Sequence, residues 1–154
     1  MEDDIKYMKM ALAEARKAYQ RAEVPIGAVV VCDDQVVGRG FNLREQTQDP
    51  TSHAEMIALR EAAANETSWR LEDCRLYVTL EPCPMCAGAI LQSRIKRLVY
   101  GASDPKAGAV RSLYQLLDDE RFNHQVEVEA GVMEKESAQL LKDFFRELRK
   151  RKDG

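Results

Sequence analysis

The strongest constraint on this chain is a set of four residues with metal-binding and acid–base chemistry: His53 and Glu55, then Cys83 and Cys86. One imidazole and two thiolates supply three ligands to a zinc ion and leave its fourth tetrahedral position open to water, as in catalytic zinc sites. Glu55 follows His53 by two residues, so it can sit beside that water, take up a proton and pass it to a leaving group. We therefore predict one catalytic zinc ion (Zn2+) per chain, with His53, Cys83 and Cys86 as ligands and Glu55 as proton shuttle.

Three other interpretations of the same residues have to be weighed. A strand that runs into Cys-x-x-Cys at the start of a helix is also typical of redox dithiols. A closed structural zinc site would need a fourth ligand, but His124, Cys74 and Cys32 do not lie at ligand-like spacing. Ser52-x-x-Glu55 also fits a capping box, in which the glutamate only stabilises a helix start.

Composition indicates an ordinary globular chain. It has 154 residues, a formal net charge of −3 and 32% charged residues, which fits a single domain, residues 1–154. The N-terminus is acidic and lacks the pattern of a signal peptide, and the apolar run 26–32 is too short to cross a membrane. Without an export signal, the four cysteines are expected to be thiols or metal ligands and not a disulfide framework, so we expect a cytoplasmic protein in which Cys32 and Cys74 are small buried residues.

Hydrophobic periodicity predicts alternating helices and strands. The expected helices are residues 3–22, 53–65, 84–93, 110–117 and 134–150. The expected strands are residues 26–32, 36–41, 76–80, 97–102 and 126–130. The first two strands are separated by a tight turn and should pair antiparallel, whereas strands joined through helices should be parallel. The order predicts an α/β fold, a three-layer α/β/α sandwich around a five-stranded mixed sheet.

In such a sheet the functional site is expected beyond the carboxyl ends of the strands, where helices begin. Both halves of the motif lie at predicted helix N-termini, so residues thirty positions apart should meet in space. The positive end of the helix dipole should also favour the thiolate over the thiol at Cys83 and Cys86, as metal binding requires.

The motif and its flanking segments resemble a known family. His-x-Glu with Pro-Cys-x-x-Cys is typical of the zinc-dependent nucleobase deaminases of the cytidine deaminase superfamily. Longer segments are similar to the bacterial tRNA-specific adenosine deaminases within that superfamily. These segments are residues 23–29, 40–42, 52–56, 79–90, 100–108 and 143–146. The resemblance covers essentially the whole chain and implies the cytidine deaminase-like fold.

The resemblance also implies a substrate and the residues that bind it. The substrate would be the adenosine at the wobble position of a tRNA anticodon stem-loop, converted to inosine, and the enzyme would be a homodimer. Asn42 would hydrogen-bond the flipped base, and Ala54 would offer its backbone to the base edge. The remaining implied contacts are Asp104 and Lys106 in one loop, and Phe144, Phe145 and Arg146 in the C-terminal tail.

Two other functions remain open at the level of sequence. The zinc motif is shared by guanine and cytosine deaminases, so it specifies the chemistry more than the substrate. A non-catalytic RNA-binding module with the same fold is a third candidate. The intact Glu55 argues against that candidate, because a structural zinc ion needs no proton shuttle.

Overall fold

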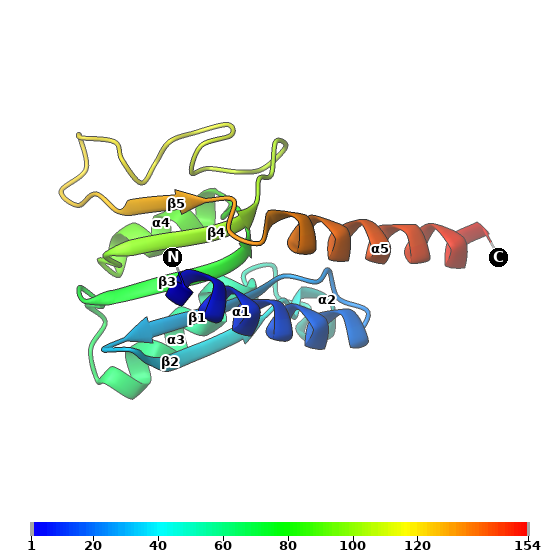
Figure 1. The fold of residues 1–154 in the computed structure, drawn as a ribbon, viewed down its shortest axis with the longest axis horizontal. Coiled ribbons are helices and arrows are strands. Elements are labelled where there is room, and N and C mark those ends of the chain that lie inside the picture. Colours follow the sequence, from blue (N-terminus) through cyan, green and yellow to red (C-terminus); the bar gives the residue numbers. More distant parts are fainter. Residues whose placement is uncertain (1, 154) are drawn as a thin grey trace.

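A computed structural model describes residues 2–153, and its centre is a single five-stranded sheet (Figure 1). The strands are β1 (Gly27–Cys32), β2 (Gln35–Phe41), β3 (Cys74–Leu80), β4 (Arg97–Ala102) and β5 (Glu127–Ala130), in the spatial order β2-β1-β3-β4-β5. Strand β1 is antiparallel to both β2 and β3, whereas β3, β4 and β5 run parallel. The sheet is therefore mixed, as predicted.

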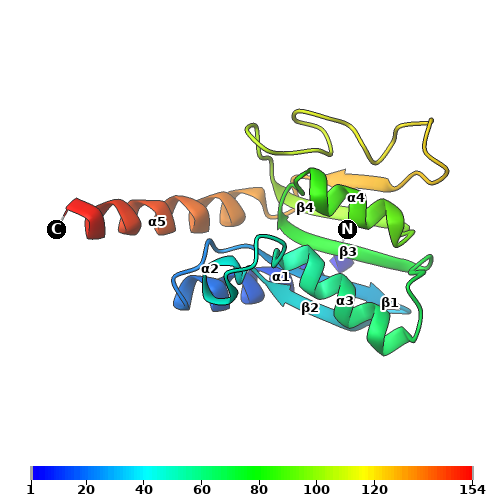
Figure 2. The same ribbon diagram turned by 180° about the vertical axis from the view of Figure 1, so that it is seen from behind.

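Helices cover both faces of this sheet. The helices are α1 (Glu2–Gln20), α2 (Arg44–Thr47), α3 (Ala54–Glu66), α4 (Pro84–Gln92) and α5 (Glu134–Asp153). Helices α1 and α5 lie on one face and α3 and α4 on the other, which gives the expected α/β/α sandwich (Figures 1 and 2). Helix α5 continues well beyond the end of the sheet (Figure 1). Within residues 2–153, no helix combines the length and apolarity needed to cross a membrane.

Strand β1 is apolar at every position because it lies between two hydrophobic cores, one on each face of the sheet. All six of its residues are buried, because helices cover the strand from both sides. Ala28 and Val30 point into the core beneath α3 and α4. Val29 and Val31 point into the core beneath α1. A run of small and β-branched residues suits such a strand, since both side-chain rows must exclude water.

One predicted helix, residues 110–117, is wrong. The segment between β4 and β5 forms only turns, although Val110 and Leu117 are buried as helical periodicity required. The reason is that the backbone N–H groups of Val110, Arg111 and Ser112 donate to the carboxylate of Glu81 and not to helical carbonyl groups. The short helix α2 was not predicted, and the other helices and strands agree with the expected ones to within three residues at each end.

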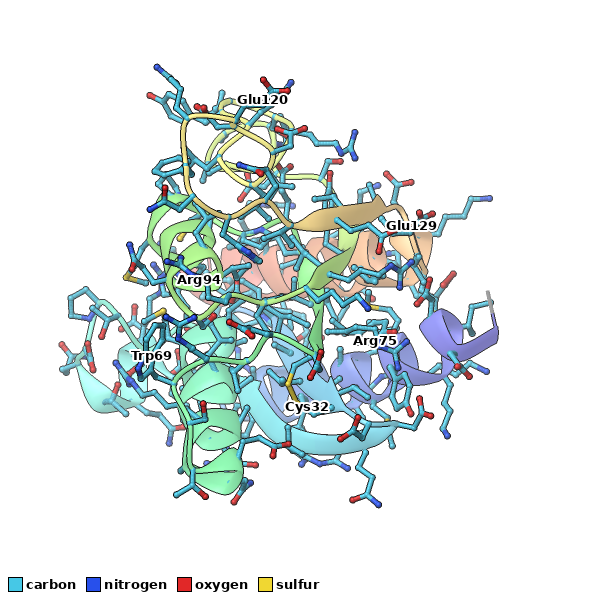
Figure 3. All side chains as sticks on the ribbon, turned by 90° about the vertical axis from the view of Figure 1, so that its left-hand side faces the viewer. Cys32, Trp69, Arg75, Arg94, Glu120 and Glu129 are labelled. Carbon is cyan, nitrogen blue, oxygen red and sulfur yellow. A yellow bond between two sulfur atoms is a disulfide. The ribbon has the colours of Figure 1, made fainter. Side chains whose placement is uncertain are left out.

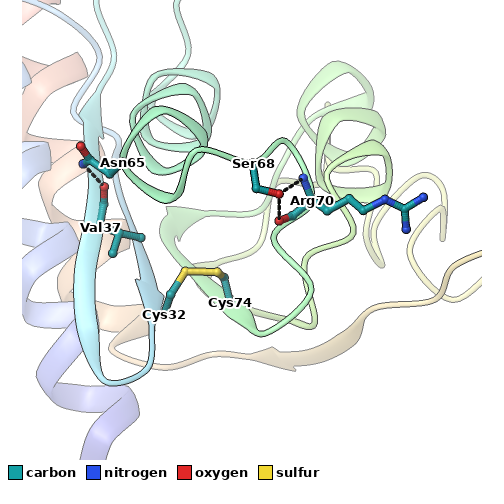
Figure 4. The surroundings of a disulfide bond; sticks show 6 residues. All are labelled: Cys32, Val37, Asn65, Ser68, Arg70 and Cys74. Carbon is teal, nitrogen blue, oxygen red and sulfur yellow. Dashed lines mark hydrogen bonds between the residues drawn. A yellow bond between two sulfur atoms is a disulfide. The ribbon is translucent and has the colours of Figure 1, made fainter.

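The expectation for Cys32 and Cys74 is also wrong, because these two residues form a disulfide (Figure 4). They are directly opposite each other on the antiparallel strands β1 and β3, with 4.4 Å between their Cα atoms. They lie 42 positions apart in the sequence, and only the register of the sheet brings them together. Both are buried, as expected, and Cys83 and Cys86 remain free.

A buried ion pair connects α1 to the sheet. The carboxylate of Asp4, 4% exposed, accepts hydrogen bonds from both terminal nitrogens of Arg97 at 2.7 and 2.9 Å. The hydroxyl of Tyr77 donates a third bond at 2.9 Å. The Arg97 guanidinium holds the pKa of Asp4 below its usual range, although burial opposes this effect. The cluster lies on the α1 face of the sheet.

Helix α3 approaches β2 closely because two glycines face it. A β-carbon at Gly38 would lie 2.2 Å from the carbonyl oxygen of Ala58, and one at Gly40 would lie 2.3 Å from that of Ala54. Any side chain at these positions would push the helix away from the sheet. Gly40 therefore determines where the first turn of α3, next to His53, can lie.

We expect Gly40→Ala to destabilise the protein by about 1–3 kcal/mol, the usual cost of overpacking, because the methyl group collides with backbone that cannot rotate away. Gly88→Ala is the matched control, since a β-carbon at Gly88 meets no atom within 4 Å and alanine favours a helix. Chemical denaturation of both variants measures the difference. Equal stability of the two variants would contradict the close contact between α3 and β2.

Candidate active site

Two helix starts bring the predicted metal ligands together. His53 is the residue that precedes α3, and Cys83 is the residue that precedes α4. Cys86 lies in the first turn of α4 and is fully buried. The Nδ1 atom of His53 is 3.6 Å from the sulfur of Cys83 and 3.5 Å from that of Cys86. The residues that the sequence predicted as ligands therefore form one cluster at the edge of the sheet.

The geometry of this cluster fits a zinc ion. All three ligand atoms lie within 4.8 Å of one another. Zinc binds nitrogen at ~2.0 Å and sulfur at ~2.3 Å, so neighbouring ligands of a tetrahedral site are separated by roughly 3.6 Å. The observed nitrogen–sulfur distances agree with that value. Among residues 2–153 no fourth histidine, cysteine or carboxylate joins the group, which leaves one coordination position for another ligand.

The protonation of the two thiols shows why a cation suits the site. The hydrogen bond from Cys86, and a further one from His53, lower the pKa of Cys83 to about 4. The same interaction raises the pKa of Cys86, because its proton is held between two sulfur atoms. Two adjacent thiolates need a positive charge between them, which a divalent ion supplies.

Glu55 lies beside this cluster without belonging to it. It occupies the first turn of α3, is 4% exposed and contributes to the same cavity as His53 and Cys83. Burial raises its pKa from the ordinary 4.5 to about 7. A carboxyl group with such a pKa can both accept and release a proton near neutral pH, as general acid–base catalysis requires.

The structure also decides the capping-box alternative for Glu55. The residue at the helix start is His53 and not Ser52, and no side chain caps the α3 N-terminus. The hydroxyl of Ser52 instead accepts a hydrogen bond from Thr47 at 3.2 Å. Glu55 therefore does not form the capping box that the sequence pattern allows.

A cavity of about 500 Å³ opens above the cluster. Apolar side chains form much of its wall, and His53, Glu55 and Cys83 form its polar end. The other lining residues are Val24, Ile26, Asn42, Arg44, Ala54, Leu80, Glu81, Asp104, Lys106, Ala107, Leu141 and Phe145. A mostly apolar pocket with a few converging polar groups is the usual form of a small-ligand site. The volume is in the range that holds a purine with its ribose.

Asn42 and Ala54, which the resemblance implies as contacts to the base, both line this cavity. Asn42 is 2% exposed and its side chain is fixed from two sides. Its Nδ2 donates to the carbonyl of Val24 at 3.2 Å, and its Oδ1 accepts from the N–H of Arg44 at 3.2 Å. Ala54 is 1% exposed and forms part of the cavity wall.

One wall is the loop that follows β4, which carries Asp104 and Lys106. The Oδ1 atom of Asp104 accepts the N–H groups of Lys106 and Ala107, both at 3.2 Å, so this segment forms a turn. Lys106 is exposed and its side chain lines the cavity. Glu81 accepts backbone hydrogen bonds from this loop. Burial raises the pKa of Glu81, but the donors led by the N–H of Arg111 outweigh it and hold the pKa at about 2.

The opposite wall is the segment that contains α2. Glu23, 1% exposed, accepts the N–H groups of Glu45 at 3.0 Å and Gln46 at 2.7 Å. These bonds hold the start of α2 beside the cavity. Arg44, which precedes them, is exposed and lines the cavity. A cation therefore lies on each side of the opening, Arg44 on one wall and Lys106 on the other.

Of the two phenylalanines in the C-terminal helix, one lines the cavity and the other packs against α1. Phe145 is 40% exposed and lines the cavity from α5. Arg146 is exposed and pairs with Asp143 at 2.7 Å. Phe144 is buried and does not reach the cavity. Its ring packs edge-on against Tyr19 of α1 at 5.7 Å and against Phe145 at 5.4 Å.

Sequence reasoning missed Arg44, Glu23 and Glu81 as parts of this site. Arg44 lies in a polar segment without periodicity, where nothing in the local pattern distinguishes a cation of the site from an ordinary surface cation. Glu23 and Glu81 were recognised only as members of longer similar segments. Their buried carboxylates bind the backbone of residues that lie more than twenty positions away, which no local pattern reveals.

Comparisons with known proteins agree with this geometry. The MafB19-like deaminase family model matches residues 2–149. The tRNA-specific adenosine deaminase of Bacillus subtilis is 53% identical over 152 residues, which cover 99% of this chain and 94% of that protein. The enzyme of the same name from Haemophilus influenzae is 52% identical over 152 residues, covering 98% and 88%.

Solved structures show the same relationship. One from a study of A-to-I editing by tRNA:A34 deaminases at the wobble position superimposes with a TM-score of 0.85 and 47% identity, covering 88% of this chain and 99% of that one. The guanine deaminase of Nitrosomonas europaea, at 22% identity and a TM-score of 0.80, covers 91% and 83% and shares the fold. With the ligand cluster, Glu55 and the cavity in the same arrangement as the sequence motif predicts, the chain belongs to the MafB19-like deaminases and, within them, to the family of tRNA-specific adenosine deaminases.

Proposed function

We propose that this chain converts adenosine to inosine at the wobble position of a tRNA anticodon by hydrolytic deamination. The observation that carries the proposal is the buried Glu55 beside the His53, Cys83 and Cys86 cluster, at the polar end of a nucleoside-sized cavity. Relatives about half identical over nearly the full chain bear the name of this activity.

The metal assigned to the cluster is one zinc ion, with His53, Cys83 and Cys86 as its ligands. The donor set supports zinc, because thiolate and imidazole ligands in tetrahedral separation are the ones this ion prefers. When bound, zinc supplies a water molecule activated for attack on a carbon that bears an amino group. The redox alternative lacks support, since a dithiol site has no use for His53 and Glu55 at the same point.

Glu55 moves the protons of the reaction. Deamination consumes one water molecule and releases inosine and ammonia, so a proton must leave the water and reach the departing nitrogen. The carboxylate of Glu55 takes the two protons of the water in turn, delivering the first to the purine ring and the second to the departing amino group. Burial raises the pKa of Glu55, which favours the uptake of a proton by its carboxylate.

The remaining cavity residues are assigned to the nucleotide and its neighbours. Asn42 and the backbone of Ala54 would face the flipped base, and Asp104 and Lys106 would contact the nucleotide from the loop wall. Phe145 would stack on a splayed base of the anticodon loop, and Arg146 would approach phosphate. Phe144 supports Phe145 from behind by its edge-on contact, so its contribution to RNA binding is indirect.

Deamination of a free base is the second candidate function, because guanine deaminases share the fold. The extended α5 argues for a larger substrate. It places Phe145 in the cavity wall and continues outward with exposed Arg146, Arg149 and Lys150. An enzyme for a free base needs no aromatic and cationic surface beyond its pocket, whereas single-stranded RNA is bound by such surfaces.

The proposal includes the setting in which the enzyme works. Residues 1–154 would act as one deaminase domain, since all five strands belong to a single sheet. We assign the protein to the cytoplasm, where its tRNA substrate lies.

A homodimer is supported by an apolar hollow between α3 and α4, lined by Met56, Leu59, Trp69 and other residues. Trp69 is 58% exposed and lies on the side of the molecule that carries α3 and α4 (Figure 3).

The first prediction separates the proton shuttle from the metal. Glu55→Ala should retain about one zinc ion per chain, because Glu55 is not a ligand, while the rate of deamination falls ~10²–10⁴-fold. Cys86→Ser should lose both zinc and activity. Elemental analysis and single-turnover assays on an anticodon hairpin measure the two effects. Faster turnover of free adenosine, cytosine or guanine than of the hairpin would contradict the tRNA assignment.

The second prediction concerns the charge of α5. Replacing Arg146 and Arg149 together with alanine should weaken hairpin binding and reduce the slope of log K against log[salt] by ~1.4, because two fewer phosphate contacts release counterions. Lys96→Ala with Arg121→Ala removes the same charge from the other end of the sheet, where β4 and β5 begin. Binding titrations over a range of salt compare the pairs, and equal slopes would show that α5 does not contact phosphate.

The third prediction concerns the homodimer. Wild-type protein should sediment at twice the mass of the chain, and Trp69→Glu should sediment as a monomer, because the change removes apolar contact surface from the hollow and adds a carboxylate that has to be desolvated on assembly. Ile5→Glu is the control, since Ile5 is 47% exposed on α1, on the other face of the sheet. A monomeric wild type at micromolar concentration would overturn the proposed assembly.

A further inference from the structure

Glu81 is a buried carboxylate that the proposed mechanism does not use. It follows the last residue of β3 and precedes Cys83 by two positions. It is 2% exposed, so its charge is removed from solvent. A buried carboxylate is stable only where hydrogen-bond donors replace the lost water. The donors at Glu81 all come from one segment, the loop between β4 and β5.

Five hydrogen bonds connect Glu81 to that loop. Its Oε1 accepts the N–H of Asp104 at 3.0 Å and the hydroxyl of Ser112 at 2.5 Å. Its Oε2 accepts three consecutive N–H groups, those of Val110 at 3.2 Å, Arg111 at 2.9 Å and Ser112 at 2.9 Å. One side chain therefore binds both ends of the segment 104–112.

The backbone of the loop also lies directly against this carboxylate. A β-carbon at Gly108 would be 2.3 Å from Cδ of Glu81 and 2.5 Å from each of its oxygens, so only glycine fits there. The N–H of Ala109 donates to the carbonyl of Pro82 at 2.9 Å, which ties the loop to the residue before Cys83 as well. The loop is thus packed on the metal-ligand segment at its centre and bonded to it at both ends.

The part of the loop that Glu81 holds is the part that faces the cavity. Asp104, Lys106 and Ala107 line it, opposite Asn42 and Arg44. The loop has no helix or strand of its own, so its position depends on these bonds together with the burial of Ala109, Val110 and Leu117 in the core. Because Glu81 precedes Cys83 by two residues, its hydrogen bonds to the loop also fix the position of the loop relative to Cys83.

We propose that Glu81 is a positioning residue that sets the distance between the Cys83 ligand segment and the nucleotide-contacting loop, and thereby the fit of the RNA substrate. This inference rests on the proposed function, because it assigns the loop wall to the nucleotide. Loss of the carboxylate should leave the metal ligands in place and release the loop. A misplacement of about 1 Å in such a wall can lower the rate ~10²-fold.

Glu81→Gln tests the inference with a side chain of nearly the same shape. Its amide group turns N–H donors toward backbone N–H groups, so several of the five bonds are lost. Zinc content should stay at the wild-type value. The kcat/KM for the anticodon hairpin should fall ~10²-fold, mainly through a higher KM, because the loop no longer completes the cavity. Trypsin should also cut after the exposed Lys106 faster than in the wild type.

Asp4→Asn is the matched control for a general loss of stability. Asp4 is also a buried carboxylate with several hydrogen bonds, but it lies in the cluster on the α1 face, with Arg97 and Tyr77. At a temperature well below the unfolding transition of both variants, Asp4→Asn should keep wild-type kinetics and wild-type resistance at Lys106. Equal losses of kcat/KM in the two variants would overturn the positioning role.

Gly108→Ala provides a second route if Glu81→Gln does not fold. The methyl group displaces the loop from the carboxylate without changing the charge, so the same rise in KM and the same proteolysis should follow. In the double variant the two effects should be less than additive, because both break one contact. Wild-type KM in Gly108→Ala, or loss of zinc from Glu81→Gln, would refute the inference. If the wild type itself does not act on the hairpin, the proposed function fails first, and the proteolysis result still reports on the loop.

Discussion

The contact on which the site depends is the direct packing of α3 against β2. Gly38 and Gly40 present no side chains to the helix, so its backbone rests on the strand. This contact determines where α3 begins, and therefore where His53 and Glu55 lie. Strand β3 independently determines where α4 begins, because it leads through Glu81 and Pro82 into Cys83. The group of His53, Cys83 and Cys86 forms where these two helix starts meet, at the carboxyl edge of the sheet.

The cavity above the cluster has walls without regular structure, and two buried carboxylates hold them. Glu23 binds the backbone at the start of α2, and Glu81 binds the backbone of the loop after β4. In both cases a buried carboxylate accepts hydrogen bonds from backbone N–H groups that would otherwise have no partner. Such charge-assisted hydrogen bonds are stronger than those between neutral groups, so they hold the loop backbone firmly. Irregular segments can therefore present Arg44 and Lys106 at fixed places on opposite sides of the opening.

The charge distribution is consistent with an acidic chain that binds RNA. The net charge of −3 provides no general attraction to nucleic acid, so binding has to come from local features. Cations line the cavity mouth and follow along α5, while Phe145 offers an aromatic surface between them. An anticodon loop displays bases that are already unpaired, so the enzyme need not separate a duplex to reach its target.

The sequence by itself determined the chemistry and the architecture. The roles proposed for His53, Glu55, Cys83 and Cys86 follow from residue type and spacing, and long periodic segments such as β1 and α5 follow from local pattern. Only the tertiary structure decided what depends on contacts between distant residues. The register of β1 and β3 pairs Cys32 with Cys74, and Glu81 takes the N–H groups that a helix at 110–117 would have used. Packing against Tyr19 turns Phe144 away from the cavity and leaves Phe145 in its wall. Local periodicity cannot reveal these outcomes, because each is determined by a partner far away in the chain.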